Sequence, residues 1–175
     1  MEYVDSLLCE IQKHIDEMVV GYENCIQLLC TIPGVDRKSA ITVISEIGVD
    51  MTQWSSHYKL VAWAGLAPGC NESAGKKKSV KISRAGVYLK SCLVQVVHAA
   101  VKDKDCDYYA NKFNNISKRR GKKRAIIAIA RKILVAIYHM LKTGEVFNPS
   151  DMADVETSQN ALNILKTISR MLTIN

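Results

Sequence analysis

Apolar residues recur at steps of three and four residues through most of this chain, and that spacing leaves few folds open. In an α-helix such residues share one face, whereas in a strand every second residue does. Aromatic residues make up only 6% of the 175 residues and proline occurs 3 times, while Ile, Leu, Val, Ala and Lys are plentiful. This composition favours packed helices over strands. We predict an all-α, multi-helix protein that forms one ordinary domain, alone or with an appendage.

The first apolar stripe predicts one amphipathic helix over residues 5–29. It either packs on its own domain or forms the end of a coiled coil. Further helices are predicted over residues 55–66, with Ser55 as the cap, and over 85–102, 122–142 and 158–173. The chain therefore divides into an N-terminal helix (1–27), a helical domain (28–149) and a C-terminal helix (150–175).

A tight hairpin joins two predicted helices at Pro33 and Gly34, and Asp36 is placed to cap the second helix. The pattern resembles the helix-hairpin-helix motif of DNA-binding proteins. In that interpretation the free amides at the second helix, with Arg37 and Lys38 beside them, hold a backbone phosphate. In the alternative interpretation the Asp36 carboxylate occupies the anion site and the turn is structural.

The net charge of +7 is concentrated in one region of the chain. Residues 70–145 contain 18 Lys and Arg against 5 Asp and Glu, or +13, whereas the remainder contains 6 against 12, or −6. The electric field of a net charge of +13 in one region attracts polyanions, and nucleic acid is the commonest polyanion inside cells. A solvated lysine-rich face is the alternative explanation.

Six cations crowd the predicted start of the 122–142 helix: Lys118, Arg119, Arg120, Lys122, Lys123 and Arg124. Cations at a helix N-terminus oppose the macrodipole and cost stability. A bound phosphate explains their presence better than solvation does. Tyr108, Tyr109 and Phe113 lie nearby in a polar helix or loop, and aromatic residues at this spacing are expected in the core.

Several classes of protein are excluded by what the sequence lacks. No apolar run approaches the roughly 18 residues of a membrane span, so we expect a cytoplasmic protein with no membrane partner. The six cysteines form no C-x-x-C pair, which predicts reduced, buried thiols and no structural metal. Phosphate-binding glycine loops and carboxylate clusters that hold two metal ions are also missing, which removes most enzyme classes.

One candidate nucleophile remains, Ser73 in the polar segment Asn71-Glu72-Ser73-Ala74-Gly75 that three lysines follow. A serine attacks a phosphodiester when a base or a lowered pKa activates it and cations stabilise the pentacovalent state. The alternative is an ordinary serine in a glycine-bearing loop.

Three segments carry a family resemblance: IPGVDRKSAITVISEIG, LVAWAGLAPGCNESAGKKKSVKISRAGVYLKSCLVQVVHAA and RRGKKRAIIAIARKILVAIYHMLKTGE. Their order and spacing, over about residues 28–147, resemble the C-terminal domain of the insertion-sequence one-ten family of transposases, which includes DNA invertases and guide-RNA-dependent recombinases. Two departures stand out. Ser-Ala-Gly replaces the usual Ser-Gly, so Ser79 and Ser83 are alternative registers for the nucleophile, and Lys90 stands where the family generally has Arg.

The resemblance implies a site-specific DNA recombinase in which Ser73 attacks the DNA backbone. It implies that Lys76, Lys77, Lys78, Lys81 and Arg84 surround the scissile phosphate, and that the six cations of residues 118–124 hold DNA or a guide RNA. The family's Mg²⁺-binding acids lie in a separate RNase H-like domain joined through a coiled coil, so we expect no metal or cofactor in this chain. We expect it to bind but not to recombine alone, and to act as a dimer or tetramer. The alternative is a non-catalytic helix-hairpin-helix module for nucleic-acid binding or assembly.

Overall fold

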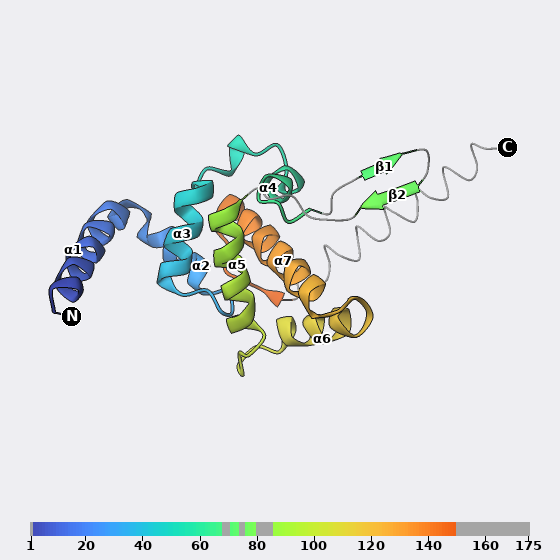
Figure 1. Ribbon diagram of the computed structural model, residues 1–175. Helices are drawn as coiled ribbons and strands as arrows, with labels where there is room; N and C mark the ends of the chain where they lie inside the picture. The colour runs from blue at the N-terminus through green and yellow to red at the C-terminus, as the bar shows by residue number, and fades with distance from the viewer. Residues whose placement is uncertain (1, 68–70, 74–75, 80–85, 150–175) are drawn as a thin grey trace.

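The computed structural model describes residues 2–67, 71–73, 76–79 and 86–149 (Figure 1). The fold is helical, as predicted. Its helices are α1 (Glu2–Val19), α2 (Glu23–Cys30), α3 (Arg37–Ile47), α4 (His57–Trp63), α5 (Val87–Ala100), α6 (Tyr108–Arg120) and α7 (Lys122–Thr143). Two 3-10 turns, η1 (Val20–Tyr22) and η2 (Met51–Gln53), precede α2 and α4. Strands β1 (Asn71–Ser73) and β2 (Lys76–Ser79) form one antiparallel pair.

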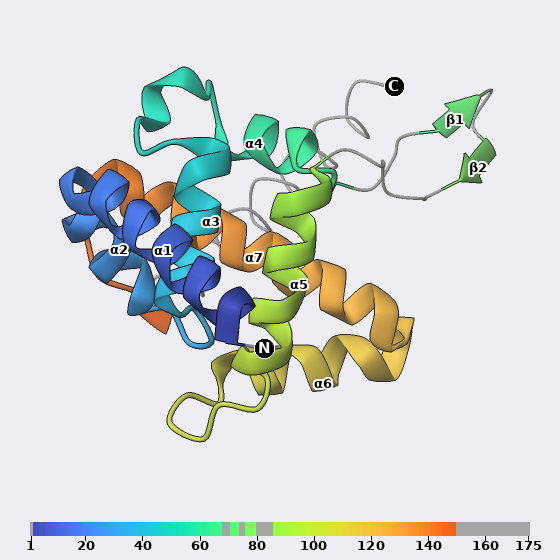
Figure 2. The ribbon, with the colours of Figure 1, turned by 60° about the vertical axis from the view of Figure 1, so that its left-hand side comes forward.

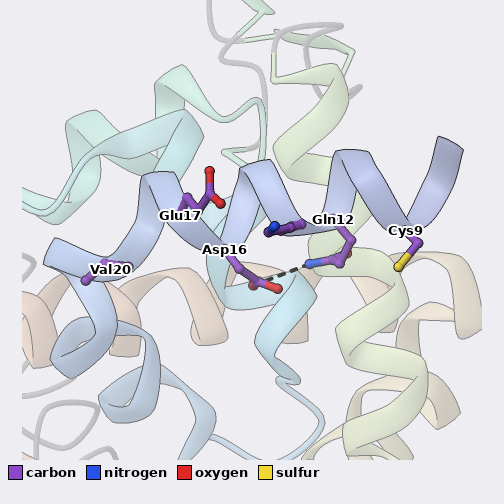
Figure 3. A pocket seen from close by; sticks show the side chains of 6 residues that line it. Cys9, Gln12, Asp16, Glu17 and Val20 are labelled. Carbon is purple, nitrogen blue, oxygen red and sulfur yellow. Dashed lines mark hydrogen bonds between the residues drawn. The ribbon is translucent and has the colours of Figure 1, made fainter. Parts of the chain in front are cut away.

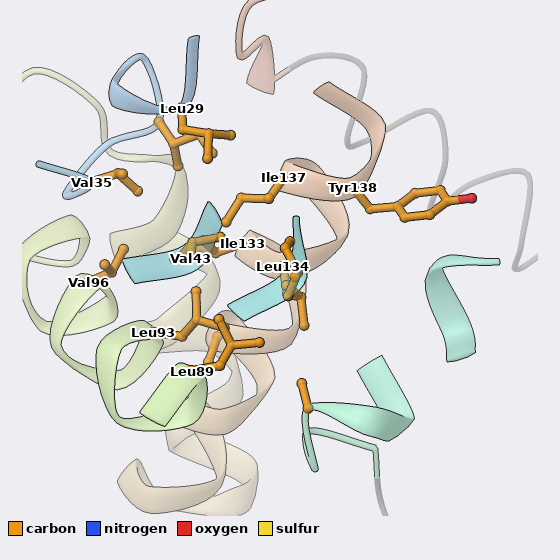
Figure 4. Close-up of a cluster of buried hydrophobic side chains, with 14 of the residues drawn as sticks. Leu29, Val35, Val43, Leu89, Leu93, Val96, Ile133, Leu134, Ile137 and Tyr138 are labelled. Atoms are coloured by element: carbon orange, nitrogen blue, oxygen red, sulfur yellow. The ribbon is translucent and has the colours of Figure 1, made fainter. Parts of the chain in front are cut away.

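The core is built around α7, which packs against α2, α4, α5 and α6. Ile133, Leu134 and Ile137 of α7 are 0% exposed. In Figure 4 they meet side chains from α2, α3 and α5, among them Leu29, Val43, Leu89, Leu93 and Val96. Removing such side chains from water is the main stabilising contribution to a domain of this size. No helix within the described part of the chain has the length and apolar content to cross a bilayer.

The turn between α2 and α3 is a packing element. Asp36 caps α3 as predicted, because its carboxylate accepts a hydrogen bond from the Ser39 N–H at 2.9 Å. Gly34 has φ +81°, and a Cβ built there would lie 2.7 Å from the Val96 carbonyl oxygen and in contact with the Ala100 backbone N. The turn therefore lies directly against the backbone of α5.

The prediction of one helix over residues 5–29 is wrong. The chain breaks at η1, which contains Gly21, a weak helix former, next to the β-branched Val20. On the N-terminal side of the break, α1 extends away from the helical body (Figure 1). Of the predicted stripe, Ile26 and Leu29 of α2 are buried, whereas Leu8, Ile11 and Met18 of α1 are exposed. Of α1, Val19 packs against the core and Asp16 contacts Arg37, whereas most of its apolar stripe is not covered by the domain.

The other local predictions have mixed outcomes. Helices α5 and α7 lie where the 85–102 and 122–142 patterns placed them, and the 108–120 segment is a helix with Tyr109 fully buried. Ser56, not Ser55, precedes α4. The five described cysteines are free, but none is fully buried, so their predicted burial is wrong. Cys70 and the predicted helix over 158–173 lie outside the described residues, as does the segment 150–175.

Replacing Gly34 with alanine is expected to destabilise the protein by about 3 kcal/mol or more, because it combines an unfavourable φ with a backbone collision. Gly144, which follows α7, is the matched control: its φ is +76° and its ψ is 8°, but nothing lies within 4 Å of its Cβ position. Gly144→Ala should therefore cost only about 1 kcal/mol. Urea denaturation followed by circular dichroism measures both changes, and equal losses would contradict this account of the turn.

Candidate nucleic-acid interface

Helices α6 and α7 meet at a sharp corner that one glycine connects. Gly121 has φ +83°, a conformation that ends α6 at Arg120 and lets α7 begin at Lys122. All residues from Lys118 to Arg124 are exposed. We call Lys118, Arg119, Arg120, Lys122, Lys123 and Arg124 the basic corner. The structure brings these six predicted residues together.

Their relation to the helix ends differs from the prediction. Lys118, Arg119 and Arg120 occupy the last turn of α6, where the macrodipole attracts cations. Only the three cations from Lys122 onward lie in the first turn of α7, where the dipole opposes them. The prediction that six cations stand at the start of one helix is thus wrong, because Gly121 divides the run between two helices.

The basic corner has no carboxylate partner within the described part of the chain. None of its six cations lies within 4.0 Å of an Asp or Glu oxygen there. The sequence of residues 108–144 contains no acid at all against ten Lys and Arg. Cations so placed repel one another in the free protein and gain from any polyanion that neutralises them.

The positive field continues along α7, where sequence reasoning singled out no residue. Lys132 is partly buried, and burial together with the charges of Lys112 and Arg131 lowers the pKa of its ammonium group to about 8. Burial is the larger cause of this lowering, and the two neighbouring cations add to it. The positive charge along α7 could have been inferred from the sequence, because neither α6 nor α7 contains an acid.

Ser73 lies in a strand and not in the loop that was predicted. In the β1–β2 ladder Ser73 is paired with Lys76 and Glu72 with Lys77. The two-residue spacing between the strands is typical of a hairpin, but such short polar strands give little sequence signal. In both ribbon views the hairpin and the α6–α7 corner lie on the side of the helical body away from α1 (Figures 1 and 2). Lys81, Ser83 and Arg84 lie outside the described residues, and of Lys77, Lys78 and Ser79 only the strand positions are described.

The Arg37 guanidinium forms ion pairs within the protein. Its Nη1 donates to both carboxylate oxygens of Glu23 at 2.7 Å, and its Nη2 lies 3.3 Å from Asp16 of α1. The hydrogen bonds with Arg37 lower the pKa of the Glu23 carboxyl. Arg37 thus connects α1, α2 and α3, and α3 packs on α2 and α5 instead of the basic corner. Lys38, the next residue, is exposed on α3.

A surface hollow runs along α1, and its described lining residues all come from that helix and the residue after it (Figure 3): Cys9, Gln12, Lys13, Asp16, Glu17 and Val20. Inside it the Gln12 amide donates to the Asp16 carboxylate at 3.4 Å. None of the residues predicted to act belongs to the hollow. Within the described residues, no group of three His, Cys, Asp or Glu side chains is arranged to hold a metal ion.

The class of protein to which this helical body with its basic corner belongs is defined by comparison with known proteins. Residues 26–113 match the family described as Transposase IS116/IS110/IS902 family, and the chain belongs to this family. The match runs from α2 into α6 and includes β1 and β2.

One relative is the transposase for insertion sequence element IS1111A of Coxiella burnetii. It is 29% identical to this chain over 147 residues, which is 82% of the chain but 40% of that protein. The chain therefore spans well under half the length of this relative.

Proposed function

We propose that this chain is the polynucleotide-binding C-terminal part of a DNA transposase, and that the basic corner holds the nucleic-acid backbone. The observation that carries the proposal is the acid-free, exposed corner with no carboxylate partner among the described residues. Membership of a transposase family supports DNA as the ligand. A guide RNA presents the same phosphate chemistry, so it is the second candidate ligand.

Binding at the corner is electrostatic in this proposal. Lysine and arginine side chains replace the counterions that condense on the phosphates, and the entropy of their release drives association. Guanidinium groups of Arg119, Arg120 and Arg124 add bidentate contacts to phosphate oxygens. Contacts of this kind fix the position of the duplex without reading its sequence.

Neutralising Lys122, Lys123 and Arg124 together with glutamine is expected to flatten the salt dependence of duplex DNA binding. The slope of log K against log salt should fall by about 0.9 for each phosphate that the variant no longer neutralises. A matched control removes three exposed cations elsewhere, at Lys13, Lys102 and Lys104. Fluorescence anisotropy over a salt series measures both variants. The same slope change in the control variant would place binding elsewhere on the protein.

We further propose that Ser73 is the nucleophile of the intact recombinase. The bond between Oγ and phosphorus forms, and the bond from phosphorus to one deoxyribose oxygen breaks. The proton of the serine hydroxyl passes to that departing oxygen, which leaves as a hydroxyl. Lys76, Lys77, Lys78, Lys81 and Arg84 are proposed to stabilise the charge that develops on the phosphate. Pairing of Ser73 with Lys76 in the ladder supports this arrangement. Mg²⁺ held by a separate RNase H-like domain would polarise the phosphate.

In a longer protein that joins this chain to such a domain, Ser73→Ala is expected to abolish DNA strand transfer while leaving duplex binding unchanged. Ser79→Ala and Ser83→Ala are the controls for register, and both should retain strand transfer. A strand-transfer assay on supercoiled plasmid separates the three variants. Full activity in Ser73→Ala would overturn its role, and activity in all three would favour the non-catalytic binding module.

We also propose that α1 forms a coiled coil with a second copy of the chain. Val4, Leu8, Ile11, Ile15 and Met18 follow the four-three-four-three spacing of a coiled-coil seam. The seam points away from the body, because Leu8, Ile11 and Met18 are exposed whereas Asp16, on the opposite face, contacts Arg37. We therefore keep the proposed division of the chain, in which residues 1–27 serve assembly, residues 28–149 bind DNA and residues 150–175 form a C-terminal helix.

The charges beside this seam favour a second copy of the same chain as the partner. Its flanking positions are Asp5, Leu7, Gln12, His14 and Val19, of which only Asp5 has a fixed charge. Two copies therefore meet without a row of like charges beside the seam, whereas a strongly basic or acidic partner would gain few pairs there. A dimer made this way would carry two basic corners, one for each of two DNA sites.

Ile11→Glu is expected to convert the dimer to a monomer, because it places a charge in the apolar seam. Ser6→Glu adds the same charge on the opposite face of α1 and should leave the dimer intact. Sedimentation velocity over a range of concentrations distinguishes the two states. A wild-type chain that stays monomeric throughout would contradict the proposed seam.

A further inference from the structure

Both tryptophans of this chain lie in one row of rings at the surface of α4 and α7. Trp54 follows η2, while His57, Tyr58 and Trp63 belong to α4. Helix α7 contributes Tyr138 and His139. We call these six residues the aromatic row. They include four of the chain's eleven Trp, Tyr and Phe residues, although α4 and α7 are far apart in sequence.

The rings form two groups that one hydrogen bond connects. Trp63 and Trp54 have centroids 5.3 Å apart, and the Tyr138 hydroxyl donates to the Trp54 carbonyl oxygen at 3.5 Å. The His57 ring lies 6.0 Å from that of Tyr138 and 4.0 Å from that of Tyr58. Trp63 thus lies in the group with Trp54, and Tyr58 in the group with His57, Tyr138 and His139.

The two ends of the row are exposed, and the core does not require them. Tyr138 is only 4% exposed, whereas Tyr58 is 49% exposed and Trp63 is 43% exposed. Large aromatic rings at a surface lose favourable free energy unless another planar or apolar group covers them. The ends therefore offer ring faces to a ligand.

Cations surround this row, and neither α4 nor α7 contains an acid. Lys59 is exposed beside Tyr58, and the Lys142 ammonium lies 5.8 Å from the centroid of the Tyr138 ring. Burial lowers the pKa of His57, and its electrostatic interactions with His139 and Arg131 lower it further. Ring faces among cations are the combination that unpaired nucleotides require, since bases stack on the rings and phosphates meet the cations.

We propose that the aromatic row binds unpaired bases of a single-stranded polynucleotide segment. This inference rests on the proposed function for the polynucleotide, but it assigns a second site with a different chemistry. A duplex keeps its bases stacked inside, so it cannot use the ring faces as a single strand does. Trp63 lies eight residues before Asn71 in the sequence, and both ribbon views place α4 at the edge of the body nearest the hairpin (Figures 1 and 2). Unpaired bases bound there would lie next to the strand that Ser73 is proposed to attack.

The test compares two single strands of equal charge, an oligothymidine of about twelve nucleotides and an abasic strand of the same length. The wild-type chain should bind the thymidine strand more tightly. Tyr58→Ala and Trp63→Ala should each weaken that binding by about 5- to 150-fold, toward the affinity of the abasic strand. Tyr3→Ala removes another exposed ring, on α1, and should change nothing. An oligouridine of equal length shows whether DNA or RNA is preferred.

Folding is checked separately, because Trp63 also contacts Trp54. Trp63→Phe keeps a ring at this position and should retain most of the preference for bases. In Trp54→Phe the remaining Trp63 fluorescence should be quenched by the thymidine strand and not by the abasic one. Equal affinity of the wild type for both strands would overturn the aromatic row as a base site, as would docking of a protein ligand there with no base dependence. Duplex binding that survives such a result would leave the basic corner unaffected, whereas loss of all binding would remove both proposals.

Discussion

The burial of α7 is the constraint on which the rest of this structure depends. Four other helices cover it, and its apolar side chains fill the centre of the core. The middle of α7 contains most of its buried side chains, whereas Lys122, Lys123, Arg124, Lys142 and Thr143 at its two ends are exposed. The basic corner lies at its first turn, and the aromatic row includes Tyr138 and His139 near its last turns. A change in the core packing around Ile133 would therefore displace both proposed binding surfaces together.

Local patterns in the sequence predicted the elements whose boundaries are set by adjacent residues. The apolar periodicity placed α5 and α7, and Asp36 marked the start of α3 through a contact with Ser39, three residues away. Failures came where the outcome depends on distant contacts. The continuous stripe over residues 5–29 concealed the break at Gly21, and α1 is held by Arg37 from another helix. Periodicity measures whether a face is apolar, but not whether anything covers it.

The site was predicted in the same partial way. The run of cations was evident from composition, yet its division between two helices depends on the conformation of Gly121, which the sequence does not encode unambiguously. The strand positions of Ser73 and Lys76 carry too few residues for a periodic signal. The aromatic row was not predicted at all. Its members span Trp54 to His139, so only the packing of α4 on α7 brings them together.

The length of α7 sets a fixed interval between the two surfaces. Sixteen residues separate Lys122 from Tyr138, and a rise of 1.5 Å per residue makes this about 24 Å. That interval equals about seven base-pair steps of B-form DNA along its axis, at the usual spacing of 3.4 Å. Helix α7 would thus act as a molecular ruler. It would keep the basic corner at a constant distance from Tyr138, the buried ring against which His57 of α4 lies.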